Sequence, residues 1–235
     1  MSTPPPTIYG WANESIPYRM ATPLGTPRAT GVVFPGAAYG QDRPLCALTR
    51  DVLVAAAVET FLVDRSYALD PSVRGLVGEE REGCIALEAG AFARVAFERA
   101  RGAPVILAGK SLGTTSMAHA LRQVPDLAAF PSIWLTPLWK DEAIFNAIAA
   151  AGSRALVLIG TADPQWDEAL RADLEKRAKR VAKSLPVIHV VQGADHGMVV
   201  AGNPAATAAV LTELKPALVQ HVASAFPVPA PVLPG

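Results

Sequence analysis

Cysteine, unbalanced charge and long apolar runs are scarce in this sequence, and each absence excludes a class of protein. The 235 residues include two cysteines, Cys46 and Cys84, which are too few for a disulfide framework and lack metal-site spacing. The 21 basic and 21 acidic residues cancel, so no net field favours nucleic acid or an anionic membrane. No apolar run free of charge and proline reaches membrane-spanning length. The N-terminus lacks the pattern of a secretory signal, and we expect a cytoplasmic protein.

The remaining composition suits one folded domain with a sizeable core. The chain is 51% hydrophobic and 18% charged, which is typical of a single α/β domain of this length. We divide it into an N-terminal segment (1–28), a main domain (29–225) and a proline-rich tail (226–235). Residues 8–11 and 17–20 are candidates for a short antiparallel hairpin in the first segment. The basic cluster at 176–180 has acidic neighbours and is interpreted as a solvated helix face.

Strand and helix patterns alternate along the main domain. Strands are predicted at 29–34, 60–64, 104–108, 132–136, 154–160 and 187–192. Helices are predicted at 43–58, 83–101, 111–123, 141–151, 165–183 and 204–224, the last interrupted near Pro216. This alternation predicts a mostly parallel sheet with helices on both faces. Ligands of such sheets bind outside the carboxyl ends of the strands, so the loops that follow the strands carry the candidate site.

The most informative of these loops has the pattern Gly-x-Ser-x-Gly. It comprises Gly109, Ser111 and Gly113, and it lies between a predicted buried strand and a predicted helix. That context is the one a nucleophile elbow requires, because the serine occupies a sharp turn that only small neighbours permit. Leu112 follows in the first helical turn, where its N–H could stabilise an oxyanion. A glycine-rich turn without chemistry is the alternative interpretation of the motif.

An acid and a histidine follow the last two predicted strands. Of the four histidines, His196 alone lies in a loop after a strand. Asp163 follows the preceding strand, and Asp167 is a rival acid in the first turn of the next helix, where acidic residues are common anyway. An Asx-turn ahead of proline is the structural alternative for Asp163. Asp195 is adjacent to the histidine and is interpreted as a loop residue. The order serine, acid, histidine is that of α/β-hydrolases.

A fourth loop follows the first predicted core strand, in the sequence Phe34-Pro35-Gly36-Ala37-Ala38-Tyr39-Gly40. In this fold the corresponding loop supplies the second N–H of the oxyanion hole. Gly36 permits a close backbone approach, and Ala37 is small enough to leave room for substrate. An ordinary Pro-Gly turn is the alternative interpretation.

Together these motifs resemble the α/β-hydrolase superfamily over about residues 29–224. The resemblance implies Ser111 as nucleophile, Asp163 as acid and His196 as base, with the N–H groups of Ala37 and Leu112 forming the oxyanion hole. Its specificity comes from four motifs in the right order, each after its own strand.

The chain is similar to the small, cap-less, dienelactone-hydrolase-like members of that superfamily. Those enzymes typically use a cysteine nucleophile, where this chain has Ser111. Many members have a histidine before the oxyanion-loop glycine, where this chain has Pro35. Residues 136–141 join a strand directly to a helix, so we predict no cap domain. The polar segment 66–82 is interpreted as a rim loop, with an outlying surface loop as the alternative.

The predicted activity is a serine hydrolase of ester-type bonds, carboxylesterase- or thioesterase-like, acting on small molecules of short or medium acyl chain. Candidate substrate-pocket residues are Tyr39, Trp139, Trp166 and Met198. No metal or organic cofactor is implied. An acyltransferase with the same triad and a non-catalytic binding protein with the same fold are the alternatives. The sequence leaves open the physiological substrate and the oligomeric state.

Overall fold

The computed structural model describes residues 5–224 and residue 226, so most of the predicted proline-rich tail lies outside the described residues. A seven-stranded sheet has the order β1-β3-β2-β4-β5-β6-β7, and only β1 runs antiparallel to its neighbour. The strands are β1 (Tyr18–Ala21), β2 (Ala29–Phe34), β3 (Val58–Val63), β4 (Val105–Lys110), β5 (Ser132–Leu135), β6 (Ala155–Gly160) and β7 (Val187–Val191). The helices are α1 (Pro44–Ala55), α2 (Gly78–Ala100), α3 (Leu112–Gln123), α4 (Glu142–Ala151), α5 (Glu168–Val181) and α6 (Pro204–Ser224).

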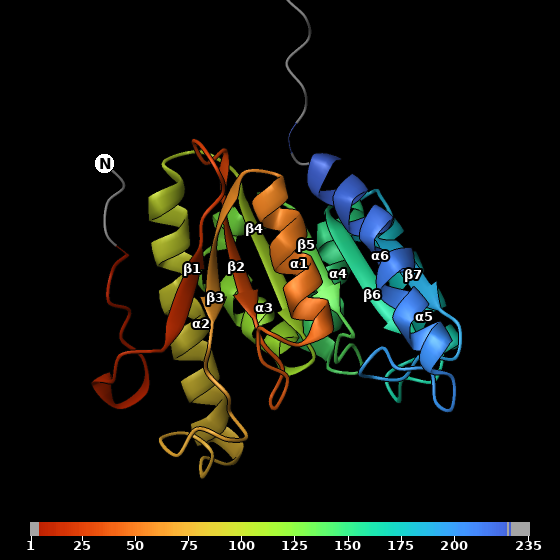
Figure 1. Ribbon diagram of the computed structural model, residues 1–235, viewed down its shortest axis with the longest axis horizontal. Coiled ribbons are helices and arrows are strands. Elements are labelled where there is room, and N and C mark those ends of the chain that lie inside the picture. Colours follow the sequence, from red (N-terminus) through yellow and green to blue (C-terminus); the bar gives the residue numbers. More distant parts are fainter. Residues whose placement is uncertain (1–4, 225, 227–235) are drawn as a thin grey trace, which may run out of the picture.

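The central strands are apolar on both faces, which is why helices cover both sides of the sheet. Every residue of β2, β3, β4 and β6 is buried. Helices α1 and α6 pack on one face, and α2, α3, α4 and α5 cover the other (Figure 1). Successive residues such as Val32 and Val33 therefore contribute to opposite cores. The predicted mostly parallel sheet with helices on both faces is confirmed.

The connection from β5 to α4 consists of residues 136–141 alone. Asp141 begins α4 as its N-cap, since its side chain accepts hydrogen bonds from the N–H groups of Ala143 and Ile144. A helical lid would need a far longer insertion at this point. The prediction that no cap domain follows this strand is confirmed.

One sequence prediction was wrong in its pairing. Strand β1 does not form a hairpin with residues 8–11 but pairs antiparallel with β3, whose edge would otherwise lack a partner. Residues 8–10 instead face residues 14–16, through an antiparallel bridge between Tyr9 and Ser15 and two backbone hydrogen bonds of 2.8 and 2.9 Å. The Tyr18 ring packs 5.5 Å from that of Phe61, and Arg19 Nε bonds Asp64 at 2.8 Å. These contacts join part of the expected N-terminal segment to the main sheet.

Two helices differ from the sequence prediction at polar or proline-containing positions. Helix α2 begins at Gly78, five residues before the expected start at 83, and Glu79 and Glu80 lie in its first turn. Acidic residues are favourable there, although such a polar stretch is also typical of a loop. Helix α6 continues through Pro216, which is exposed while Leu214 and Leu218 are buried. Water can therefore bond the carbonyl that the proline leaves unpaired.

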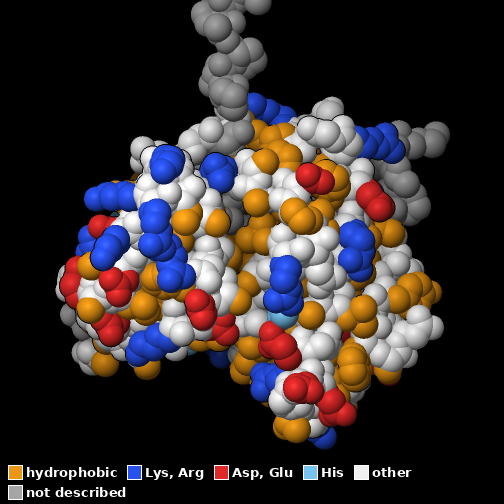
Figure 2. Space-filling view, turned by 180° about the vertical axis from the view of Figure 1, so that it is seen from behind, with side chains coloured by type: hydrophobic (Ala, Val, Ile, Leu, Met, Phe, Trp, Pro, Cys, Tyr) orange, Lys and Arg blue, Asp and Glu red, His pale blue; other side chains and the backbone are white. Residues whose placement is uncertain are grey.

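Figure 2 shows the face covered by α2 to α5, where basic side chains gather near acidic ones. On α5, Arg171 pairs with Glu168 and Glu175. Arg177 of the same helix lies 3.9 Å from Glu142 of α4. The charges of this face are thus partly balanced, in agreement with a solvated helix surface. Within the described ranges, no helix is long and apolar enough to cross a membrane.

Candidate active site

Ser111 lies in a turn between β4 and α3, at the carboxyl edge of the sheet. Its backbone has φ 53° and ψ −115°, a conformation that L-residues adopt only at a cost. The surrounding structure enforces it, because the Ser111 N–H donates to the Leu135 carbonyl at 3.0 Å. The Ser111 carbonyl accepts from the N–H and the hydroxyl of Thr114 at 2.8 and 2.6 Å. This backbone presents the Ser111 hydroxyl beyond the sheet edge.

The two glycines of the motif are required because a side chain at either position would clash with backbone atoms. A Cβ atom on Gly109 would lie 2.4 Å from the carbonyl oxygen of Gly113, and one on Gly113 would lie 2.3 Å from that of Phe34. Because these neighbours are backbone atoms, no side-chain rotation can relieve either clash. The spacing Gly-x-Ser-x-Gly is therefore a packing requirement of this turn.

Residues from three loops converge on the Ser111 hydroxyl. His196 Nε2 lies 2.7 Å from Ser111 Oγ, and His196 Nδ1 lies 2.8 Å from Asp163 Oδ2. Asp163 follows β6 and its side chain is fully buried, whereas that of His196 is 32% exposed. The other oxygen of Asp163 accepts the Gln165 N–H at 2.8 Å. A buried carboxylate thus holds a partly exposed imidazole against the serine.

The two neighbouring acids have structural partners. Asp167 is the N-cap of α5 and accepts from the N–H groups of Ala169 and Leu170. Asp195 Oδ1 accepts from the N–H groups of Gly197 and Val199 at 2.8 and 2.9 Å. These bonds cap a helix and shape the His196 loop. The structure therefore brings Asp163 to the histidine and not Asp167.

The loop after β2 lies beside the elbow. Gly36 N–H donates to the Tyr39 carbonyl at 3.0 Å, and Tyr39 N–H donates back to that of Gly36 at 3.4 Å. The Ala37 N–H donates to no other described residue, although its carbonyl accepts two hydrogen bonds. Leu112 opens α3, where N–H groups have no acceptor within the helix. Both N–H groups are thus available to a ligand.

Lys110 directly precedes Ser111, and sequence reasoning gave it no role. Its residue is 4% exposed. Its Nζ lies 4.7 Å from the centroid of the Tyr39 ring, and burial lowers its pKa to about 8. Its Nζ makes no hydrogen bond or ion pair with another residue in the part of the chain that the structure describes. A lysine between Gly109 and Ser111, at the end of an otherwise apolar strand, is the sequence feature that could have drawn attention to it.

Two of the four candidate pocket residues, Met198 and Trp139, line different cavities. Met198 lines a cavity of about 580 Å³ between the start of α1 and the loop after His196. Trp139 lines another, of about 440 Å³, between α4 and α5. Trp139 is buried, stacks on Trp166 with ring centroids 6.0 Å apart and donates its Nε1–H to the Gln165 carbonyl. Tyr39 covers Lys110. Among the described residues no cluster suited to a metal ion occurs.

No family model and no curated protein matches the sequence, but solved structures match its fold. A lid-less α/β serine hydrolase from Xanthomonas campestris is 16% identical, with a TM-score of 0.66 and 94% of each chain covered. Est1E from Butyrivibrio proteoclasticus, with ferulic acid bound, is 12% identical, with a TM-score of 0.65 and coverage of 93% of this chain and 100% of that one. Esterase 2 of Thermogutta terrifontis, phosphorylated by paraoxon, is 16% identical, with a TM-score of 0.61 and 92% of each chain covered.

These likenesses extend over nearly the whole chain and concern its architecture. They agree with the mostly parallel, helix-covered sheet described above. The chain has the α/β-hydrolase fold and, like the first of these structures, no lid.

Proposed function

We propose that this α/β-hydrolase-fold protein is a serine hydrolase that cleaves ester-type bonds through an acyl-enzyme on Ser111. The observation that carries the proposal is the continuous hydrogen-bonded chain from Ser111 Oγ through the His196 ring to Asp163 Oδ2, with distances of 2.7 and 2.8 Å. Nucleophile, base and orienting acid in such a chain are the parts of a nucleophilic hydrolase. The esterases that share the fold support the same reaction class.

In the first step, Ser111 Oγ attacks the carbonyl carbon of the substrate and its proton passes to His196 Nε2. The tetrahedral intermediate collapses as the bond to the leaving alcohol breaks, and His196 returns the proton to that alcohol. Water then attacks the acyl-enzyme, again with His196 as base, which releases the acid and restores Ser111. Asp163 fixes the histidine tautomer and stabilises the imidazolium that forms in both steps.

The oxyanion that forms at each tetrahedral stage needs donors that are already in place. The N–H groups of Ala37 and Leu112 are the two candidates, because the first belongs to a tightly closed loop and the second to a helix N-terminus. Losing one such donor costs about 3–4 kcal/mol in comparable enzymes. The buried ammonium of Lys110, adjacent to Ser111 in sequence, adds positive potential on the same side of the sheet edge.

An apolar cavity lined by the residues that follow His196 supports the proposed substrate class. Its walls carry no charged side chain and consist of Pro44, Leu45, Gly197, Met198, Val199, Val200, Gly202, Asn203, Pro204, Thr207, Ala208 and Leu211. Gly197 and Met198, which directly follow His196 in sequence, belong to this lining. An acyl chain extending from Ser111 would bury its methylenes there, each contributing about 0.8 kcal/mol. We assign short- and medium-chain esters as substrates, because the described residues form no lid that could cover a longer chain.

The proposal is tested by hydrolysis of p-nitrophenyl acetate and butyrate with the purified protein and with Ser111→Ala. The wild type should release p-nitrophenol and free acid, and the variant should turn over about 10⁴- to 10⁶-fold more slowly. Circular dichroism shows whether the variant keeps its fold. A wild type without activity on esters or thioesters, or a variant as active as the wild type, would refute the proposal. Added alcohol, with ester products measured, separates acyl transfer from hydrolysis.

A further inference from the structure

The segment after β3 is bonded to the proposed oxyanion loop through one atom, the carbonyl oxygen of Ala37. Ser66 Oγ donates to it at 2.8 Å, and the Ala68 N–H donates to it at 3.1 Å. The carbonyl and the N–H of Ala37 are separated only by the two backbone torsions of that residue. Holding the carbonyl therefore restricts the directions in which the N–H can point.

The peptide on the other side of Ala37 is also held. The Gly36 carbonyl accepts the Tyr39 N–H at 3.4 Å, inside the closed turn of the loop. The C=O and N–H of a trans peptide point in opposite directions. The Ala37 N–H, which belongs to the same peptide as the Gly36 carbonyl, thus points out of the turn. Two contacts therefore restrict the direction of the Ala37 N–H: the bond from Ser66 to the Ala37 carbonyl and the bond from Tyr39 to the Gly36 carbonyl.

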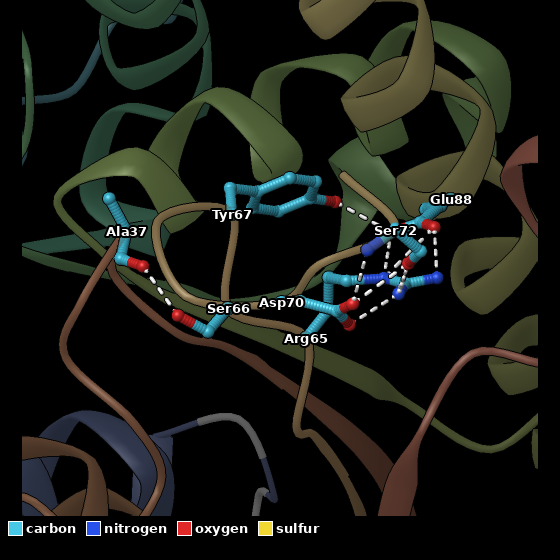
Figure 3. A network of polar contacts seen from close by, with 7 residues as sticks. All are labelled: Ala37, Arg65, Ser66, Tyr67, Asp70, Ser72 and Glu88. Atoms are coloured by element: carbon cyan, nitrogen blue, oxygen red, sulfur yellow. Dashed lines mark hydrogen bonds and ion pairs between the residues drawn. The ribbon is translucent and has the colours of Figure 1, made fainter. Parts of the chain in front are cut away.

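A buried network gives the Ser66 segment its shape (Figure 3). Arg65 Nη2 bonds Glu88 Oε1 of α2 at 2.8 Å, and these two side chains are 3% and 2% exposed. Arg65 Nη1 bonds Asp70 at 2.5 Å and Ser72 Oγ at 2.9 Å. The Tyr67 hydroxyl donates to the second oxygen of Glu88 at 2.8 Å. Breaking a buried pair of this kind is costly, so the segment is a rigid support.

Ser66 lies between Arg65 and Tyr67 in sequence, but its side chain points away from their shared partner Glu88. Arg65 and Tyr67, its sequence neighbours, both bond Glu88, while the Ser66 side chain points toward Ala37 (Figure 3). Alternation of side chains along an extended segment explains this arrangement. The charged network therefore anchors the backbone from which the Ser66 hydroxyl reaches the oxyanion loop.

We propose that Ser66 is a positioning residue, whose hydroxyl orients the Ala37 N–H toward the oxyanion from a backbone held by Arg65 and Glu88. This role rests on the proposed function. Ser66 acts through Ala37 and makes no bond to the substrate. Its effect belongs to the tetrahedral stage, where the oxyanion exists, and not to the binding of the neutral ester. Loss of the hydroxyl should therefore lower kcat and leave KM unchanged.

The test compares Ser66→Ala, Ser66→Thr and Ser72→Ala in the full chain. Ser72 belongs to the same segment and bonds Arg65 and Asp70 but not Ala37, so it is the matched control. With p-nitrophenyl acetate we expect kcat of Ser66→Ala to fall about tenfold, less than the 10²- to 10³-fold loss on removing a donor altogether. Ser66→Thr should restore most of kcat, and Ser72→Ala should lose far less kcat than Ser66→Ala, because Glu88 and Asp70 still hold Arg65. The pH profile of kcat/KM should keep its midpoint, because His196 and Asp163 are untouched.

Wild-type kcat in Ser66→Ala, an effect on KM alone, or an equal loss in Ser72→Ala would overturn the role. Should Ser66→Ala fail to fold, Ser66→Cys keeps the volume with a much weaker donor and should show the same loss of kcat. Fluorophosphonate labelling separates this proposal from the proposed function. A wild type that is not labelled at Ser111 refutes the function itself. A labelled wild type, with Ser66→Ala labelled equally fast, refutes only the role of Ser66.

Discussion

A Cβ atom placed on Gly113 would lie 2.3 Å from the carbonyl oxygen of Phe34 and 2.7 Å from that of Pro35. The helix that follows Ser111 therefore touches the backbone that leads into the oxyanion loop. This contact fixes how far Leu112 can lie from Ala37, the two residues whose N–H groups we assign to the oxyanion hole. Gly113 thus helps to set the distance between the two N–H groups of the oxyanion hole.

Gly113→Ala should therefore damage both stability and activity. The clash is with backbone and must be relieved by moving α3, which we expect to cost about 1–3 kcal/mol in the free energy of unfolding. Moving α3 also moves Leu112, so kcat/KM should fall. Urea denaturation and ester hydrolysis measure the two effects. Gly75→Ala is the control, because a Cβ there has nothing within 4 Å. Equal stability and activity of Gly113→Ala and the wild type would contradict the packing argument.

Asp163 and Asp167 should respond oppositely to loss of their carboxylates. Asp163→Asn replaces the carboxylate with a neutral amide, whose NH2 group can face His196 Nδ1 and favour the wrong tautomer, and it should cost about 10⁴ in turnover. Asp167→Ala removes an N-cap and should cost about 1 kcal/mol of stability with turnover unchanged. Steady-state kinetics and thermal unfolding of both variants test the assignment. A large loss of turnover in Asp167→Ala, with Asp163→Asn nearly unaffected, would exchange the two roles.

Lys110 makes stability depend on pH in an unusual direction. Burial lowers its pKa from 10.5 to about 8, so between these values the unfolded chain binds a proton that the folded chain lacks. Stability contributed by this residue should accordingly rise as the pH increases through that window. Near neutral pH, Lys110→Met should have a larger free energy of unfolding than the wild type. That difference should shrink by about 3 kcal/mol as the pH rises through the window between the two pKa values.

Denaturant unfolding from pH 7 to pH 11 measures this difference. Burial raises the pKa of nearby Cys46 from 9.0 to about 12, so this thiol lowers stability as the pH rises above 9. Both proteins contain Cys46, and its contribution therefore cancels in the difference between them. Exposed Lys179 is the control, and Lys179→Met should differ from the wild type by an amount that does not change with pH. A difference between wild type and Lys110→Met that is constant over the whole range would show that Lys110 is not buried as described.

The apolar cavity beside His196 should set the preferred acyl length. Ala208→Phe places a ring in its wall and should lower kcat/KM for p-nitrophenyl hexanoate much more than for the acetate. Ala209→Phe alters the next position of α6, outside the cavity lining, and should leave the ratio unchanged. Without a lid, activity should not jump when an ester passes its solubility limit. Wild-type efficiency that keeps rising to long chains, or activation by emulsified ester, would indicate a deeper site.

Much of this fold was predictable from sequence because its signals are local. The buried strands are apolar runs, and Gly109 and Gly113 mark the turn through spacing alone. The antiparallel pairing of β1 with β3 could not be predicted, because the two strands are far apart in sequence and the local pattern favours a hairpin. The polar start of α2 is typical of a loop, although its acidic residues are also favourable in the first turn of a helix.

The support of the site could not be predicted. The Arg65–Glu88 pair joins residues 23 apart in sequence, and the bond from Ser66 to Ala37 joins residues 29 apart. No local pattern marks either interaction. Trp139 and Met198 follow strands at the same sheet edge but line separate cavities. Strand order predicts which loops meet, and side-chain packing decides what those loops enclose.

The most direct test of the central claim is the site at which an active-site-directed fluorophosphonate binds covalently. The wild type, Ser111→Ala and Ser116→Ala are treated with the probe, digested and analysed by mass spectrometry. Ser116 lies in α3, is 3% exposed and is the nearest alternative serine in sequence. We predict one probe adduct on Ser111 in the wild type and in Ser116→Ala, and none in Ser111→Ala. An adduct on another residue with Ser111 unmodified, or no adduct on the folded wild type, would contradict the account.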